Sequence, residues 1–344
     1  TVTPVNDVPT ITALEDLTIL EDASQQTILL AGISSGKTNE TQALTVTAVS
    51  SDTTLIANPT INYSSADATG ALVYVPKADQ HGTATITVTV QDDGGTTNDG
   101  VDLVTTSFGV SVTSVNDVPT MTTLEDLTIL EDASEQTVSL AGIGSGAANE
   151  SETLTLTVTS SNTDLIPDPQ LTYTSPGNAG SISFTPVADN YGASTITIKV
   201  ADSGGIASGG VDTLITSFNV AVTAVNDIPV IASVNDITIL EDATAQSVEL
   251  SNIGSGKDNE TQTITITAAS SDTTLIADPT VSYSSSDADG SLAYIPKPDQ
   301  YGSTTITVTV QDDGGTENSG VDQDTTTFII TVTPVNDVPT ITVL

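Results

Sequence analysis

The chain has 344 residues and no cysteine, and its 44 acidic residues against 5 lysines and no arginine give a formal net charge of -39. This balance excludes nucleic acid as a partner, because binding to phosphates requires a basic surface. The hydrophobic content of 37%, much of it alternating with polar residues, favours folded strands over disorder.

One motif, Val-Asn-Asp-x-Pro, recurs with its asparagine at positions 6, 116, 226 and 336, a spacing of 110 residues each time. A fixed period of this length indicates a tandem array of one module. Residues 1–5 match residues 331–335, so we expect the chain to be an excerpt from a longer array. The predicted division is the end of a preceding repeat at 1–5, repeats at 6–115, 116–225 and 226–335, and the start of a following repeat at 336–344.

Seven segments of the first repeat show the period-two pattern or the β-branched content of strands, and clusters of Gly, Asn, Asp and Pro separate them. In chain order these segments are Thr10–Leu20, Thr27–Ile33, Gln42–Ser50, Thr60–Tyr63, Ala71–Val75, Thr83–Val90 and Ser107–Thr113. The pattern predicts an all-β fold of three tandem seven-stranded immunoglobulin-like Greek-key β-sandwiches in an elongated rod. Aromatic residues at equivalent positions, Tyr63 and Phe108 with their counterparts, are predicted core residues.

Chain direction assigns the acidic turns to the two poles of each sandwich. The first and fifth turns and the end of the last strand share one pole, and the second and sixth turns share the other. The residues expected at the first junction are Glu21, Asp22, Asp79, Asn116, Asp117, Asn149, Glu150 and Asp202. Their equivalents at the second junction are Glu131, Asp132, Asp189, Asn226, Asp227, Asn259, Glu260 and Asp312. The outer poles carry Asp7, Glu40 and Asp92 at one end, and Glu241, Asp242, Asp299 and Asp337 at the other.

Carboxylates gathered in this number require a counter-charge, since two unit charges about 4 Å apart repel by roughly 4 kcal/mol at an effective dielectric of 20. We expect no lysine or arginine at the junctions to offset them. Ligands that are all oxygen suit a hard cation with about 6 to 8 ligands, which favours Ca²⁺ over Mg²⁺. With no cysteine and one histidine, zinc and copper are disfavoured. The residues named for the junctions and outer poles are therefore predicted Ca²⁺ ligands.

The motifs Val115–Pro119, Leu20–Asp22 and Gln91–Gly95, together with Asp79 and the pair Asn149–Glu150, are similar to those of a known family. The whole chain resembles the cadherin-like tandem modules of large bacterial surface proteins and, more distantly, cadherin repeats. The resemblance implies that Ca²⁺ is clamped between neighbouring modules by the junction residues. The turn at Asp79 offers one carboxylate where cadherins have two, which implies one or two ions per junction.

We therefore expect a monomeric, Ca²⁺-stiffened structural spacer of an extracellular, adhesin-type bacterial surface protein, whose partners are Ca²⁺ and neighbouring repeats. No apolar run approaches the roughly 20 residues of a membrane helix, so no membrane insertion is expected in this segment. An enzyme is not expected, because tyrosine replaces His81 in the other copies and no nucleophile–base set is present. The alternative is a Ca²⁺-dependent adhesion or carbohydrate-binding module that contacts its ligand directly. The sequon at Asn149 and its equivalents also permits glycosylation.

Overall fold

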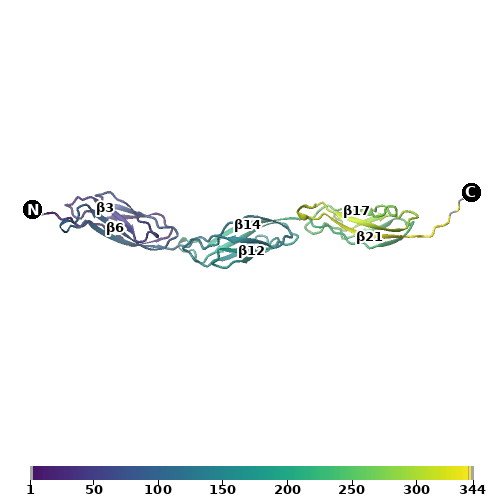
Figure 1. Cartoon of the computed structure of the whole chain (residues 1–344), viewed down its shortest axis with the longest axis horizontal. Helices are drawn as coiled ribbons and strands as arrows, with labels where there is room; N and C mark the ends of the chain where they lie inside the picture. The colour runs from purple at the N-terminus through teal and green to yellow at the C-terminus, as the bar shows by residue number, and fades with distance from the viewer. Residues whose placement is uncertain (1–2, 340, 342–344) are drawn as a thin grey trace.

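In the computed structural model, which describes residues 3–339 and 341, the chain forms three similar all-β units that follow one another along one axis (Figure 1). The first and third units lie at opposite ends of this row. Each unit has one four-stranded and one three-stranded sheet, which confirms the predicted row of immunoglobulin-like sandwiches. Of the predicted end segments, residues 1–2, 340 and 342–344 lie outside the described part.

The first unit contains seven strands, and its last two strands are the longest. They are β1 (Leu17–Leu20), β2 (Gln26–Ala31), β3 (Leu44–Ser50), β4 (Thr60–Asn62), β5 (Thr69–Tyr74), β6 (Gly82–Asp92) and β7 (Leu103–Thr113). One sheet has the order β1-β7-β6-β3 and the other β2-β5-β4. Strand β1 runs parallel to β7, whereas the other pairs are antiparallel. A 3₁₀ turn, Thr97–Asp99, lies between β6 and β7.

The second and third units repeat this plan. The second contains β8 (Leu127–Leu130), β9 (Gln136–Ala141), β10 (Thr155–Ser160), β11 (Gln170–Thr172), β12 (Ala179–Phe184), β13 (Gly192–Ala201) and β14 (Thr213–Thr223). The third contains β15 (Ile237–Leu240), β16 (Gln246–Leu250), β17 (Thr265–Ser270), β18 (Thr280–Ser282), β19 (Gly290–Tyr294), β20 (Gly302–Gln311) and β21 (Gln323–Thr333). Their 3₁₀ turns are Ala207–Gly209 and Glu317–Ser319.

Alternation along β6 shows why these sequences form sandwiches. Ile86, Val88 and Val90 are fully buried, whereas the threonines between them lie on the outer face of the sheet. Ile86 is directly opposite Phe108 of β7 in the antiparallel pair, and cross-strand pairs of this kind stabilise the inner face. The strand is therefore held by one apolar face, as the period-two pattern predicts.

Each unit has its own hydrophobic core. Phe108, Phe218 and Phe328 are each 2% exposed and lie among buried Leu, Ile and Val side chains of their own unit. Burial of one such side chain contributes about 1.5–3 kcal/mol. Tyr63 is half-buried and packs against the edge of the first core. The predicted core role of the aromatic residues is therefore confirmed.

The first predicted strand, Thr10–Leu20, is not continuous, and that prediction was wrong. Thr10 forms a single antiparallel bridge with Ser34, beyond the end of β2, and regular pairing begins only at Leu17, which lies beside β7. The segment thus passes from the three-stranded sheet to the four-stranded sheet, and the crossing interrupts the ladder. In the described part of the chain, no helix has the length and apolar composition that crossing a bilayer requires.

Candidate metal centres at the module ends

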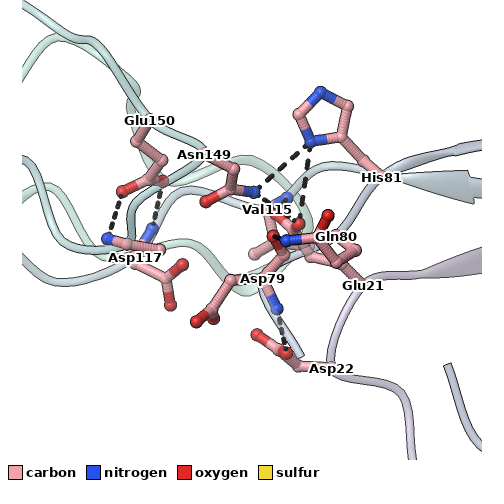
Figure 2. A network of polar contacts seen from close by, with 10 residues as sticks. Glu21, Asp22, Asp79, Gln80, His81, Val115, Asp117, Asn149 and Glu150 are labelled. Carbon is pink, nitrogen blue, oxygen red and sulfur yellow. Dashed lines mark hydrogen bonds and ion pairs between the residues drawn. The ribbon is translucent and has the colours of Figure 1, made fainter. Parts of the chain in front are cut away.

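Three aspartates gather at the C-terminal pole of the first unit. Asp22 follows β1, Asp79 precedes β6, and Asp117 belongs to the linker after β7. One carboxylate oxygen from each lies within 4.8 Å of the other two, and Figure 2 shows the three side chains turned toward a common space. We call this set the first triad. The second triad is Asp132, Asp189 and Asp227, and the third is Asp242, Asp299 and Asp337.

Backbone conformation aims two members of each triad. Asp22 has a φ of 61° and Asp79 a φ of 54°, in the left-handed region that Asp and Asn tolerate better than most residues. The Asp79 N–H donates to Oδ1 of Asp22 at 3.1 Å, which joins the two turns. The same bond recurs between Asp189 and Asp132 at 3.0 Å and in the third unit at 3.2 Å. The local sequence therefore builds the same acidic corner three times.

A buried glutamate joins the first and second corners to the linker and to the next unit. Glu21 is 3% exposed, and its Oε1 accepts a hydrogen bond from the Val115 N–H at 2.6 Å. Its Oε2 accepts one from Nδ2 of Asn149, in the second unit, at 2.9 Å. At the second junction Glu131 accepts the equivalent bond from Asn259 at 3.1 Å. Glutamate here thus connects the two units directly.

Asp117 is positioned by the second unit, although its carboxylate faces the first. Its N–H donates to Oε1 of Glu150 at 2.7 Å, and Oε2 of Glu150 accepts the Ala147 N–H at 3.1 Å. The preceding residue, Asn116, donates from Nδ2 to the carbonyl oxygen of Val211 at 2.7 Å. The first triad therefore combines two side chains held by one unit with a third held by its neighbour.

Burial raises the pKa of Asp117, and the negative charges of Glu150, Asp22 and Asp79 raise it further. Burial also raises the pKa values of Asp227 and Glu131 at the second junction. Oδ2 of Asp117 is buried without a hydrogen-bond partner in the described structure. Each pair of carboxylates about 4.8 Å apart repels by roughly 0.9 kcal/mol in water and by about 3.5 kcal/mol at an effective dielectric of 20. The corner is therefore an arrangement of oxygens that a cation would stabilise.

Several predicted ligands serve the turn between the last two strands instead. Oδ1 of Asp202 accepts the Gly204 N–H at 2.8 Å, and Asp202 is not a member of the first triad. In the first unit the equivalent Asp92 is 5% exposed and accepts a hydrogen bond from Nδ2 of Asn6 at 2.9 Å. The third unit repeats this bond between Asn226 and Asp312 at 3.0 Å. Asp92 and Asp312 thus fasten the linker to the loop that follows β6 or β20, whereas the bond of Asp202 stays within its own loop.

Two groups of residues were missed by sequence reasoning. Gln42 donates from Nε2 to Oδ1 of Asn6 at 2.7 Å, and Gln262 does the same to Asn226 at 2.7 Å. Lys257 of the third unit extends to the second triad, where its Nζ lies 2.9 Å from Oδ1 and 3.0 Å from Oδ2 of Asp189. The expectation that no lysine offsets the junction carboxylates is therefore wrong at the second junction. The sequence signal that could have revealed this contact is the difference between Lys37, Ala147 and Lys257 at equivalent positions of the three copies.

The remaining predicted residues of the outer poles make the same hydrogen bonds as their equivalents at the junctions. Asp7 donates its N–H to Oε1 of Glu40 at 2.8 Å, as Asp227 does to Glu260 at 2.8 Å. Glu241 is 6% exposed and accepts the Val335 N–H at 2.6 Å. The acidic corner and its glutamate are thus formed at all three C-terminal poles.

The fold and the repeated acidic poles define a class, that of tandem β-sandwich modules similar to immunoglobulin and cadherin domains. The model of the bacterial Ig domain family matches residues 6–105 and 226–331, more than half of the chain. The chain belongs to this family. Its members are structural modules rather than enzymes, and they are typically extracellular.

The search of solved structures returned chains of consecutive cadherin or immunoglobulin domains. Three cadherin domains (EC22–24) of mouse cadherin-23 are 15% identical with a TM-score of 0.40, over 96% of this chain and 100% of that one. The human desmocollin-1 ectodomain is 12% identical with a TM-score of 0.36, over 96% of this chain and 62% of that one. A mutated three-domain Ig fragment of titin is 11% identical with a TM-score of 0.35, over 94% and 98%. The comparison with curated proteins returned no match.

Proposed function

We propose that this chain is a spacer of an extracellular bacterial surface or adhesin-type protein, and that Ca²⁺ bound at the triads stiffens the connections between its units. The observation that carries the proposal is the first triad. Asp22 and Asp79 of one unit and Asp117, held by the next, each place a carboxylate oxygen within 4.8 Å of the others. An ion bound there would contact side chains positioned by both units.

The donor set supports Ca²⁺ over other metals. The candidate ligands of the triads are carboxylate oxygens, of which Oδ2 of Asp117 is buried without a partner, and Oδ1 of Asn149 is a further oxygen in the same condition. Ca²⁺ accepts irregular oxygen shells at about 2.3–2.6 Å, whereas Mg²⁺ requires a near-ideal octahedron and retains its waters. Extracellular modules bind Ca²⁺ with dissociation constants of about 10⁻⁴ to 10⁻³ M, and we expect this range here.

Stiffening follows because one ligand of the triad, Asp117, is held by the second unit through the bond from its N–H to Glu150. Without a cation, the repulsion among the carboxylates favours separation of Asp117 from Asp22 and Asp79. With Ca²⁺, the same carboxylates bind one ion. The free energy by which binding stabilises the aligned form then grows with the logarithm of the ratio of the Ca²⁺ concentration to the dissociation constant. The linker then changes from a hinge to a fixed connection.

Small-angle X-ray scattering of the whole chain in millimolar Ca²⁺ and in EGTA tests the proposal. Strands of about ten residues rise roughly 3.3 Å per residue, so one unit with its end turns spans about 35–45 Å and three aligned units about 110–130 Å. A defined maximum dimension in this range with Ca²⁺, which becomes broad in EGTA, is expected. Identical profiles, together with no heat of Ca²⁺ binding in calorimetry, would refute it. A glycan array with the same sample tests the alternative of direct carbohydrate binding.

A further inference from the structure

The two junctions differ in charge at the position of Ala147 and Lys257. Lys257 lies 110 residues after Ala147, and Lys37 lies 110 residues before it. The ammonium group of Lys257 extends from the third unit to the second and contacts both carboxylate oxygens of Asp189, at 2.9 and 3.0 Å. Ala147 has no polar side chain, so the first triad has no corresponding contact. One junction thus contains a built-in cation that the other lacks.

The nearest basic side chain at the first junction serves a different residue. His81 lies with Nδ1 3.8 Å from Oε2 of Glu21 and 3.4 Å from Nδ2 of Asn149. Figure 2 shows its ring turned away from the space among Asp22, Asp79 and Asp117. Among the residues that the structure describes, the first triad therefore has three carboxylates and no positive side chain in contact. The second triad has three carboxylates and one ammonium.

The position of the ammonium decides its effect. Asp189 belongs to the second triad, and a Ca²⁺ ion bound by that triad would take oxygens that Lys257 now occupies. The ammonium also lowers the repulsion that separates the units when no metal is bound, because it attracts the carboxylates of the neighbouring unit. Both effects make the second junction respond less to Ca²⁺. The first weakens Ca²⁺ binding, and the second keeps the two units aligned when no metal is bound.

We propose that Lys257 acts as a tethered counter-ion, which keeps the second junction aligned at low Ca²⁺ and makes it less responsive to Ca²⁺ than the first. The Ca²⁺ part of this proposal rests on the proposed function, whereas the alignment in the absence of metal does not. The chain is then a rod with one Ca²⁺-dependent hinge, at residues 115–119, and one connection held by its own side chains. The residue at the position of Ala147 and Lys257 sets the Ca²⁺ threshold of each junction.

The competing interpretation is an ordinary surface ion pair. Lys257 is 46% exposed and Asp189 32% exposed at the side chain, and exposed pairs between mobile side chains often contribute nothing measurable. The feature that separates the two interpretations is the location of the pair between two units. An inert pair would leave the distance distribution across the junction unchanged when it is removed.

Paired spin labels resolve the two junctions separately in the whole chain. No native cysteine interferes, and Ser107, Ser217 and Thr327 are exposed, equivalent positions on the last strand of each unit. Cysteines at 107 and 217 report the first junction, and cysteines at 217 and 327 report the second. The distance distribution between the two labels is measured by pulsed electron paramagnetic resonance, first in EGTA and then along a Ca²⁺ titration.

Reciprocal exchange provides the variants. Lys257→Ala gives the second junction the residue of the first, and Ala147→Lys does the opposite. Lys199→Ala removes the same charge from the exposed face of β13 and is the control. In EGTA we expect the wild-type distribution to be narrow across the second junction and broad across the first. Lys257→Ala should broaden the second, and Ala147→Lys should narrow the first.

The Ca²⁺ titration gives the second measurement. A single and a double positive charge about 5 Å apart repel in water strongly enough to change affinity on the order of tenfold. Lys257→Ala should therefore lower the Ca²⁺ concentration that half-saturates the second junction by about that factor, and Ala147→Lys should raise it at the first. Equal distributions in EGTA for Lys257→Ala and wild type would overturn the proposal. If those distributions differ but Ca²⁺ has no effect on any variant, the counter-ion stands and the Ca²⁺ function fails.

Discussion

Replacement of Asp117 by asparagine removes one of the three charges of the first triad with little change in side-chain size. The backbone N–H at this position, which donates to Oε1 of Glu150 at 2.7 Å, remains available in the variant. The cores of the two units are not touched, because Asp117 lies in the linker between β7 and β8. The substitution therefore alters the junction and leaves each sandwich folded.

The structure gives the size of the effect in the metal-free chain. Asp117 takes part in two of the three carboxylate pairs of the triad, each with oxygens within 4.8 Å. Each pair costs between about 0.9 kcal/mol, at the dielectric of water, and about 3.5 kcal/mol at an effective dielectric of 20. The substitution thus removes roughly 2–7 kcal/mol of repulsion from the aligned arrangement. With Ca²⁺ it removes a charged ligand, which lowers affinity on the order of tenfold or more.

The two effects have opposite signs, which makes the assay specific. In EGTA, Asp117→Asn should narrow the distance distribution between labels at 107 and 217 relative to wild type. In millimolar Ca²⁺ it should broaden that distribution, so the difference between the two conditions becomes smaller. Asp99→Asn, at an exposed position of the first unit, removes the same charge and should leave both distributions unchanged. A variant with the wild-type response to Ca²⁺ would show that the linker carboxylate is not a ligand.

Three further outcomes are expected. Because the pKa of Asp117 is raised in the folded junction, protonation of this carboxylate favours the aligned form. In scattering, the metal-free chain should therefore become more ordered as pH falls toward the usual aspartate value of 3.8 and lose that order as pH rises through the raised pKa. In calorimetry, it should bind Ca²⁺ more weakly at about pH 5 than at pH 7. Glu21→Ala should lower the melting temperature more than Glu241→Ala, because Glu21 also accepts a hydrogen bond from Asn149 of the next unit. A hydrogen bond to a charged group contributes about 1.5–3 kcal/mol to stability. Equal losses of melting temperature in the two variants would contradict the role of Glu21 between the units. Phe218→Ala should destabilise the second unit by about 3–5 kcal/mol, and scanning calorimetry should show one shifted transition beside two unshifted ones if the cores are independent.

Local patterns were sufficient to predict six of the seven strands of the first unit and the acidic corner. Alternation along residues 83–90 predicts an outward face and a buried face, and β6 has both. The alternating direction of the strands then fixes the pole at which each turn lies, so topology brings Asp22, Asp79 and Asp117 to the same pole. These predictions succeed because each depends on neighbours within a few residues or on the direction of a strand.

Contacts that depend on side-chain reach between distant segments could not be predicted in the same way. Asp202 shares a pole with Asn149 and Glu150, yet its carboxylate is used by the loop that it starts. Lys257 crosses from one unit to another, so its contact depends on how two sandwiches are oriented. The break in the strand expected at Thr10–Leu20 likewise depends on which sheet offers a free edge, a property of the assembled unit rather than of the segment.

The third triad shows how much of a junction one unit builds alone. Asp242, Asp299 and Asp337 lie as close together as the other sets, although all three are exposed. The acidic corner therefore forms from one sandwich and its linker. What a following unit adds is seen at the first junction, where Glu150 fixes the linker aspartate and Asn149 binds the buried glutamate. Stability in such an array is a sum of unit terms and nearest-neighbour terms. The cores and acidic corners recur in every copy. The residue at the position of Ala147 and Lys257 can therefore change the interaction energy between two neighbouring units while leaving the stability of each unit unchanged.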